Sequence, residues 1–286
     1  MKIETVKETL QKAKRYIVDK DKLAEMEAED SLWLHRDFVN THPEVIMEVV
    51  GYARSPLRNN GLHLLVDIGA STLDAATFII HSRAGEDLYP LLETRVKRLG
   101  TMTLHSIRIQ DLKKSFETHL QEMSEIDPLN VLPDQSYYKM SPKETVDETD
   151  SVFFKECSIV IGETVRETKN KRDPFSIAWE KGLSVFICGG GGRFIGYRDA
   201  IVKRGKAIEA NVADFAGLNI KNIPKPDQLD APDLSLSDYD RLAVAYGLSF
   251  TVDEIGEVIP EKEIVDIVNE SRALNVDDRF ISKDMC

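Results

Sequence analysis

The chain has 286 residues, enough for one large domain or two modest ones with cores of their own. A composition of 42% hydrophobic and 30% charged residues is typical of a globular protein, and a net charge of −12 argues against a nucleic-acid partner. No apolar run is long enough to span a membrane, the N-terminus lacks a signal peptide's apolar core, and the three cysteines form no C-x-x-C pair. We therefore expect a cytoplasmic protein with reduced thiols and no membrane partner.

Two helices are predicted before residue 60. Residues 1–30 place apolar side chains at helical spacing, which indicates an amphipathic helix. Such a helix could bind a membrane or a partner, but the acidic stretch 25–30 disfavours an anionic bilayer, and packing on its own domain is the plainer interpretation. A second helix is predicted to begin at Thr41-His42-Pro43 and to end near Tyr52.

Residues 61–80 are the stretch around which the rest of the chain is organised. An apolar run ends on Asp67, and a second apolar run begins after Asp74, which predicts two strands joined by a tight turn. The residues of the turn are Gly69, Ala70, Ser71 and Thr72. Small residues let backbone N–H groups approach a ligand, and carboxylates suit a hydrated Mg²⁺ that also binds phosphate oxygens. The stretch therefore predicts a phosphate loop, although an ordinary hairpin uses the same residue types for conformational reasons.

The next elements are a strand, a helix, a loop and a second helix. Residues 88–96 predict a third strand, and Leu99-Gly100-Thr101 opens a helix. Residues 120–150 are rich in proline and acids, which indicates a loop or a much-reduced insertion. Residues 152–171 predict a helix with a basic end.

A glycine run marks the second informative stretch. The apolar strand 183–188 leads into Gly189, Gly190, Gly191 and Gly192, followed by Arg193 and a predicted helix over 197–204. Backbone without side chains can lie flat against a ligand, although a flexible turn has the same composition. The run is not a dinucleotide fingerprint, because the third glycine would fall on Phe194, and it is not a Walker loop.

The C-terminal part offers packing signals rather than chemistry. Residues 211–236 predict an edge strand and a loop rich in proline and aspartate, and residues 238–247 predict a helix with small residues on one face and a glycine stop. Small faces permit close helix packing. The charged residues 251–286 carry no recognisable chemical motif.

Three motifs stand in a familiar order: Asp67-x-Gly69-x-x-Thr72-x-Asp74, the later strand with Gly189-Gly190-x-x-Arg193, and the closing helix 243–247. Over residues 40–250 they resemble the nucleotide-binding domain of the actin, sugar-kinase and heat-shock ATPase superfamily, most closely the heat-shock protein 70 branch, whose members are chaperones, and its bacterial actin-like relatives. The resemblance implies an α/β, actin-like (ribonuclease H-like) ATPase fold with ATP and Mg²⁺ as cofactors.

The resemblance also implies residue roles. Asp67 looks like the carboxylate that holds the hydrated Mg²⁺ and faces the attacking water, which makes it the catalytic and metal-binding candidate. Gly69–Thr72 look like the cradle of the β- and γ-phosphates, and Asp74 matches the second acid of the motif. Gly189–Gly192 look like the glycines beside ribose and adenine, with Arg193 near the base. Phosphoryl transfer needs such positioned donors and a metal rather than a covalent nucleophile.

The chain departs from this family in three ways. Nothing in residues 1–60 resembles the family's first phosphate loop, so we expect an incomplete first lobe. His42 replaces the heat-shock branch's glutamate before Pro43, and the insertion that contacts adenine is reduced to residues 120–150. We expect residues 1–60 to be a helical remnant of the first lobe, 61–250 the second lobe, and 251–286 a charged tail without a peptide-binding domain.

Three functions are consistent with these features. The first is an ATP-binding, actin-like or chaperone-like protein, whose missing lobe a protein partner or self-association would supply. The second is a non-catalytic interaction module built on a degenerate ATPase fold. The third is a sugar or acid kinase, which ranks last because no substrate-binding aspartate is recognisable. ATP or ADP is the ligand expected under the first function.

Overall fold

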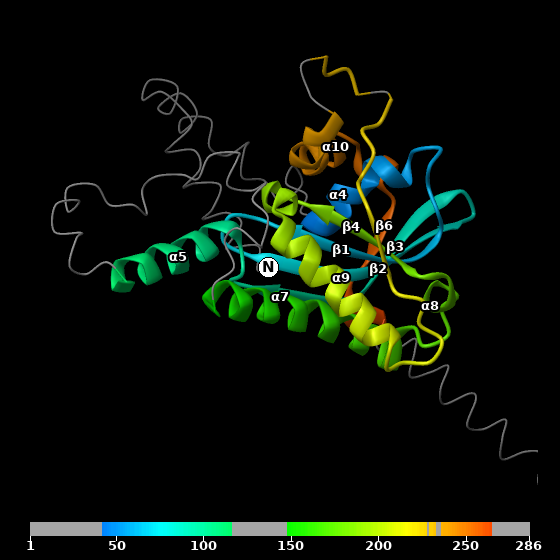
Figure 1. Ribbon diagram of the computed structural model, residues 1–286. Helices are drawn as coiled ribbons and strands as arrows, with labels where there is room; N and C mark the ends of the chain where they lie inside the picture. Colours follow the sequence, from blue (N-terminus) through cyan, green and yellow to red (C-terminus); the bar gives the residue numbers. More distant parts are fainter. Residues whose placement is uncertain (1–41, 116–147, 228, 233–235, 265–286) are drawn as a thin grey trace, which may run out of the picture. The chain divides into compact units, whose positions relative to one another are not determined.

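The computed structural model describes residues 42–115, 148–227, 229–232 and 236–264 (Figure 1). The chain divides into two compact units, residues 1–43 and 44–286, and every element below belongs to the second unit. The predicted helix at 1–30 and residues 120–147 of the predicted insertion lie outside the described residues. The assignment of residues 1–60 to a first-lobe remnant therefore stays a prediction.

A six-stranded mixed sheet forms the centre of the second unit, with the strands in the order β5-β4-β1-β2-β3-β6. The first three strands form an antiparallel meander. β4 and β5 add on the other side of β1 and run parallel to it, and β6 runs parallel to β3. The strands are β1 (Gly61–Ile68), β2 (Leu73–Arg83), β3 (Glu86–Lys97), β4 (Leu183–Cys188), β5 (Leu218–Lys221) and β6 (Glu257–Ile259).

This arrangement confirms the predicted fold class. A three-stranded meander extended across its first strand by two helix-linked parallel strands, with helices on both faces, is the α/β, ribonuclease H-like order of actin-like folds. The hairpin of residues 61–80, the third strand and the strand before the glycine run are all confirmed. The predicted edge strand within 211–236 is confirmed as β5.

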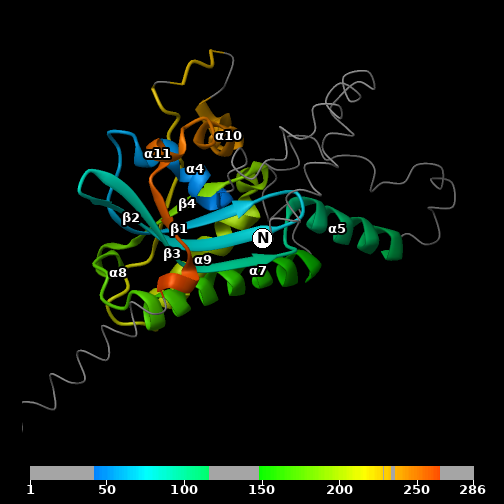
Figure 2. The same cartoon turned by 180° about the vertical axis from the view of Figure 1, so that it is seen from behind.

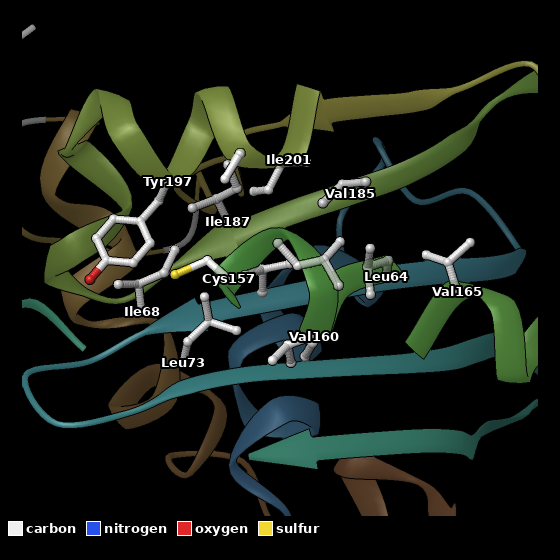
Figure 3. Packing of buried hydrophobic residues seen from close by; sticks show 14 of the residues in the cluster. Leu64, Ile68, Leu73, Cys157, Val160, Val165, Val185, Ile187, Tyr197 and Ile201 are labelled. Carbon is white, nitrogen blue, oxygen red and sulfur yellow. The ribbon is translucent and has the colours of Figure 1, made fainter. Parts of the chain in front are cut away.

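Two long helices, α7 (Glu148–Glu167) and α9 (Ile195–Glu209), cover one face of the sheet (Figure 1). Figure 3 shows Leu64 and Ile68 of β1 packed among Val160 of α7 and Ile201 of α9. These four side chains are 4% exposed or less, so this face supplies the larger of the two cores.

The opposite face carries α4 (Glu44–Ala53) and α10 (Ala243–Gly247), seen above the sheet in Figure 2. A Cβ on Gly247 would overlap the backbone of Met47, so the two helices pack at backbone distance, as the small residues of 243–247 predict. Leu65, from the middle of β1, points into this second core. Side chains alternate along a strand, so Asp67 lies on the α4 face as well.

The remaining helices and turns complete the fold. The helix predicted from Gly100 is confirmed, whereas the single helix predicted over 238–247 is wrong in its first half, which is a 3-10 turn. Part of the predicted tail forms α11 and β6, and β6 joins the sheet beside β3. No helix among the described residues is both long and apolar enough to cross a membrane. The remaining helices and turns of the fold are α5 (Thr101–Ser115), the π-turn η5 (Thr168–Arg172), α8 (Ala178–Lys181), the 3-10 turns η6 (Gly190–Arg193) and η7 (Leu236–Arg241), and α11 (Val252–Ile255).

Candidate functional site

The sheet has a topological switch point between β1 and β4. These strands are parallel neighbours, but the chain leaves β1 towards β2 on one side and leaves β4 towards β5 on the other. Ligands of open α/β sheets bind outside the carboxyl ends of the strands at such a point, because diverging connections leave backbone groups uncovered there. The candidate site therefore lies where β1 and β4 end, at Ile68 and Cys188.

The structure brings the sequence-predicted acids together at this place. Asp67 and Asp74 are direct partners in the β1–β2 register, and Asp67 also pairs with Cys188 across the parallel β1–β4 ladder. A Cβ on Gly189 would overlap the Asp67 carboxylate, so the first glycine of the run lies directly against it. Two motifs that are 115 residues or more apart in the chain thus meet at Asp67.

Burial and neighbouring negative charge change the protonation of these acids. Burial, together with Glu44 and Asp74, raises the pKa of Asp67 to about 6. Burial also raises the pKa of Asp74, while a hydrogen bond from Thr72 opposes the rise. Asp74 Oδ1 is buried and has no partner among the described residues. A cation at this site would relieve the repulsion and favour the ionised carboxylates.

Sequence reasoning missed two acids of this site, Glu44 and Glu48 on α4. The side chain of Glu48 is 2% exposed, and its pKa is raised well above the ordinary value, mainly by burial and then by Asp67. The Cys188 thiol hydrogen-bonds to the Glu48 carboxyl group, and burial among other acids favours the neutral form of that carboxyl group. The detectable signal was an acid in the middle of the apolar run 45–53, one helical turn after Glu44.

The turn between β1 and β2 is fixed by hydrogen bonds from the start of α5. The backbone N–H groups of Gly100, Thr101 and Met102 donate to the carbonyls of Ser71 (3.1 Å), Gly69 (3.1 Å) and Ala70 (2.8 Å). A Cβ on Gly100 would lie 2.5 Å from backbone atoms of Ala70 and Ser71, so only glycine permits this contact. Three consecutive carbonyls of the turn are therefore committed to one helix terminus.

This arrangement leaves three consecutive N–H groups for a ligand. In a trans peptide the N–H points opposite to the carbonyl, and there are no cis peptides among the described residues. The N–H groups of Ala70, Ser71 and Thr72 consequently point away from α5. No hydrogen bond between described residues uses them, and Ala70 and Ser71 are exposed. Successive outward N–H groups form a concavity that suits an anion.

The glycine run is explained largely by packing. A Cβ on Gly191 would overlap Ile68 and Thr101, and one on Gly192 would lie 2.6 Å from Ile187. A Cβ on Gly190 would meet nothing within 4 Å, and the residue is exposed. Gly189 is therefore the glycine of the run that lies against the Asp67 carboxylate, and Gly190 is the one beside open space.

Arg193 is held by acids on the turn η7. Its guanidinium pairs with Asp238 at 2.6 Å and with Asp240 at 2.9 Å. These pairs attach the end of the glycine run to η7, which the sequence did not predict. They give Arg193 a structural part in the fold, and its predicted place near a base stays a prediction.

The residues present suit a hydrated Mg²⁺ rather than a metal cage. No group of three or more His, Cys, Asp or Glu side chains among the described residues could hold a metal ion by itself. Mg²⁺ keeps several waters and uses one or two carboxylates plus phosphate oxygens, so Asp67 and a bound phosphate would be sufficient. The nearby Glu44 and Asp74 add the negative potential that attracts a cation.

Comparisons with known proteins show a likeness to solved structures. No protein-family model matches the sequence, and no curated protein matches it. The chain is similar to the crystal structure of MreB5 of Spiroplasma citri bound to ADP, with a TM-score of 0.45 and 15% sequence identity. That similarity covers 86% of this chain and 73% of the other.

Proposed function

We propose that this chain binds Mg-ATP at the carboxyl ends of β1 and β4. Residues 69–72 would hold the β- and γ-phosphates, and Asp67 would hold the hydrated Mg²⁺. Gly189 and Gly190 would lie beside the nucleoside, with Arg193 towards the base. Asp74 would assist as the second acid. These roles follow the resemblance of the sequence to actin-like and heat-shock ATPases, and the geometry of the turn supports them.

One observation carries the proposal: the three outward N–H groups of residues 70–72 next to the Asp67 carboxylate at the switch point. The N–H groups attract a phosphate, whereas the acids Glu44, Asp67 and Asp74 would repel a bare one. N–H groups that attract an anion, next to carboxylates that attract a cation, suit a phosphate that is bound to a divalent cation. This combination favours a metal–nucleotide complex over a bare anion.

Bound Mg²⁺ would supply neutralisation of the phosphate charge. The chain's own residues would supply position: residues 70–72 orient the terminal phosphate, and the Asp67 carboxylate accepts a hydrogen bond from a water facing it. Hydrolysis then requires the ionised form of Asp67, because only a carboxylate accepts that bond on either oxygen.

Calorimetric titration of the full chain with Mg-ADP and Mg-ATP tests the proposal. We expect micromolar binding by the wild-type protein and its loss in Asp67→Ala, while Asp253→Ala on the exposed surface of α11 serves as the matched control. Release of phosphate from Mg-ATP would then measure turnover. A folded wild-type protein that gives no heat with either nucleotide would overturn nucleotide binding and leave the interaction module built on a degenerate ATPase fold.

A further inference from the structure

A buried tyrosine lies behind the start of α5. Tyr197, in the first turn of α9, is 1% exposed. Its ring packs edge-on against Phe154 at 5.3 Å and Phe153 at 6.1 Å between centroids. Its hydroxyl group donates a hydrogen bond of 2.9 Å to the carbonyl of Leu99, the residue before Gly100. The ring belongs to the core, whereas the hydroxyl group reaches the link that holds the turn of residues 69–72.

From this hydroxyl group a chain of hydrogen bonds runs through two peptide groups. The Leu99 carbonyl belongs to the same peptide as the N–H of Gly100, and that N–H donates to the Ser71 carbonyl at 3.1 Å. The Ser71 carbonyl in turn belongs to the same peptide as the N–H of Thr72, one of the three outward donors. The Thr103 hydroxyl group donates to the same Ser71 carbonyl at 3.2 Å.

We propose that Tyr197 is a positioning residue for phosphate binding, acting through Leu99 and Gly100 on the N–H of Thr72. This inference rests on the proposed nucleotide site. Each peptide whose carbonyl accepts a hydrogen bond becomes a better donor at its N–H, so hydrogen bonds in such a chain strengthen one another. The Tyr197 hydroxyl group thus fixes the orientation of the Ser71–Thr72 peptide and strengthens its N–H towards an anion.

The effect of Tyr197 on phosphate binding should be separable from any effect on nucleoside binding. The chain of hydrogen bonds ends at the N–H of Thr72, which faces the phosphates. The residues assigned to the nucleoside, Gly189 and Gly190, are not part of that chain of hydrogen bonds. Removing the hydroxyl group should therefore weaken binding of the phosphates and leave binding of the nucleoside unchanged. A general loss of stability would weaken both equally.

Tyr197→Phe tests the inference because it deletes the hydroxyl group and keeps the ring. In the nucleotide-free protein, we expect the amide proton resonances of Gly100 and Thr72 to shift upfield, as hydrogen bonds weaken along the chain. With Mg-ADP, we expect affinity to fall about three- to tenfold, the range of one net hydrogen bond, with adenosine affinity unchanged. Tyr89→Phe on β3, which also deletes a buried phenol hydroxyl group, should show neither effect.

The amide measurement keeps the two proposals separable. If wild-type protein binds no Mg-ADP, the proposed function fails, and the amide shifts still decide whether Tyr197 acts on Thr72. Unchanged shifts at Gly100 and Thr72, or equal weakening of Mg-ADP and adenosine, would overturn the inference. Should Tyr197→Phe not fold, Thr103→Val removes the second donor to the Ser71 carbonyl and must produce the same Thr72 shift.

Discussion

The carboxylate of Asp67 lies directly against the α-carbon of Gly189, so that any side chain at residue 189 would occupy the space of Asp67 Oδ1. This contact joins the last acid of β1 to the first glycine after β4, and the parallel register of Asp67 with Cys188 maintains it. The Asp67 side chain therefore lies against the backbone of Gly189, and no side chain at residue 189 separates the two halves of the candidate site.

Gly189→Ala should damage the site and the fold together. Gly189 has φ 72° and ψ 159°, a conformation essentially restricted to glycine, which costs other residues about 1–3 kcal/mol. The added methyl group would also displace the Asp67 carboxylate. We expect a lower free energy of unfolding in denaturant and loss of Mg-nucleotide binding in calorimetry. Gly190→Ala, where a Cβ meets nothing, is the matched control and should change stability by less than about 1 kcal/mol.

Binding of Mg-ADP should strengthen as pH rises through 6. Asp67 has its pKa raised to about 6, and a metal-holding carboxylate must be ionised, so binding competes with a proton below that pH. Between pH 7.5 and pH 5 the proton on Asp67 should reduce affinity about tenfold, in addition to the nucleotide's own titration. Calorimetry at several pH values measures the slope. A slope no steeper than the titration of the nucleotide itself produces would contradict the assignment.

His63 should destabilise the fold in acid. It is 2% exposed, it stacks on Phe78 and lies tilted against Phe186, and its Nε2 donates to the Asn59 carbonyl at 2.9 Å. Burial lowers its pKa to about 4, from 6.5 in the unfolded chain. Its contribution is thus complete above pH 6.5 and is lost as pH falls towards 4, for a total of about 3 kcal/mol.

The raised pKa values of Asp67, Asp74 and Glu48 act in the opposite direction, because acids that are protonated in the folded state stabilise it as pH falls. The His63 contribution is therefore read from the difference between wild-type protein and His63→Leu in urea unfolding at pH 7.5 and pH 4.5. We expect that difference to shrink or reverse at the lower pH. A His81→Gln control, exposed on β2, should give a constant difference.

Breaking the ion pair between Arg108 and Asp150 should strongly destabilise the protein. Asp150 of α7 is fully buried, and the Arg108 guanidinium of α5 holds both of its oxygens, with one hydrogen bond of 2.8 Å from Nε. The same guanidinium lies 5.2 Å from the ring centroid of Phe194, next to the glycine run. Asp150→Asn should cost about 3–5 kcal/mol, since it breaks a buried ion pair by removing the charge of one partner. Equal unfolding free energies for Asp150→Asn and Glu156→Gln, an exposed change on α7, would refute this.

The hairpin could be predicted from sequence because its signals are local. Apolar runs on each side of Gly69–Thr72 specify strands, and small residues between acids specify a tight turn, so β1, β2 and their register follow from neighbours in the chain. The helix at Gly100 and the strand before Gly189 are local signals of the same kind. Local patterns failed over 238–247, where the pair of Asp238 and Asp240 with Arg193 accompanies a 3-10 turn in place of a continuous helix.

The sequence by itself determined the two strands of the hairpin, the turn between them, and the identity of Asp67 and Asp74 as the acids beside it, because short-range hydrophobic periodicity and turn chemistry decide those features. Only the tertiary structure placed Glu44 and Glu48 with Asp67, put α5 under the turn, and brought the Tyr197 hydroxyl group to Leu99. These contacts join residues from 19 to about 100 positions apart. Their geometry depends on how strands order in the sheet and how helices pack on it, which no local pattern encodes.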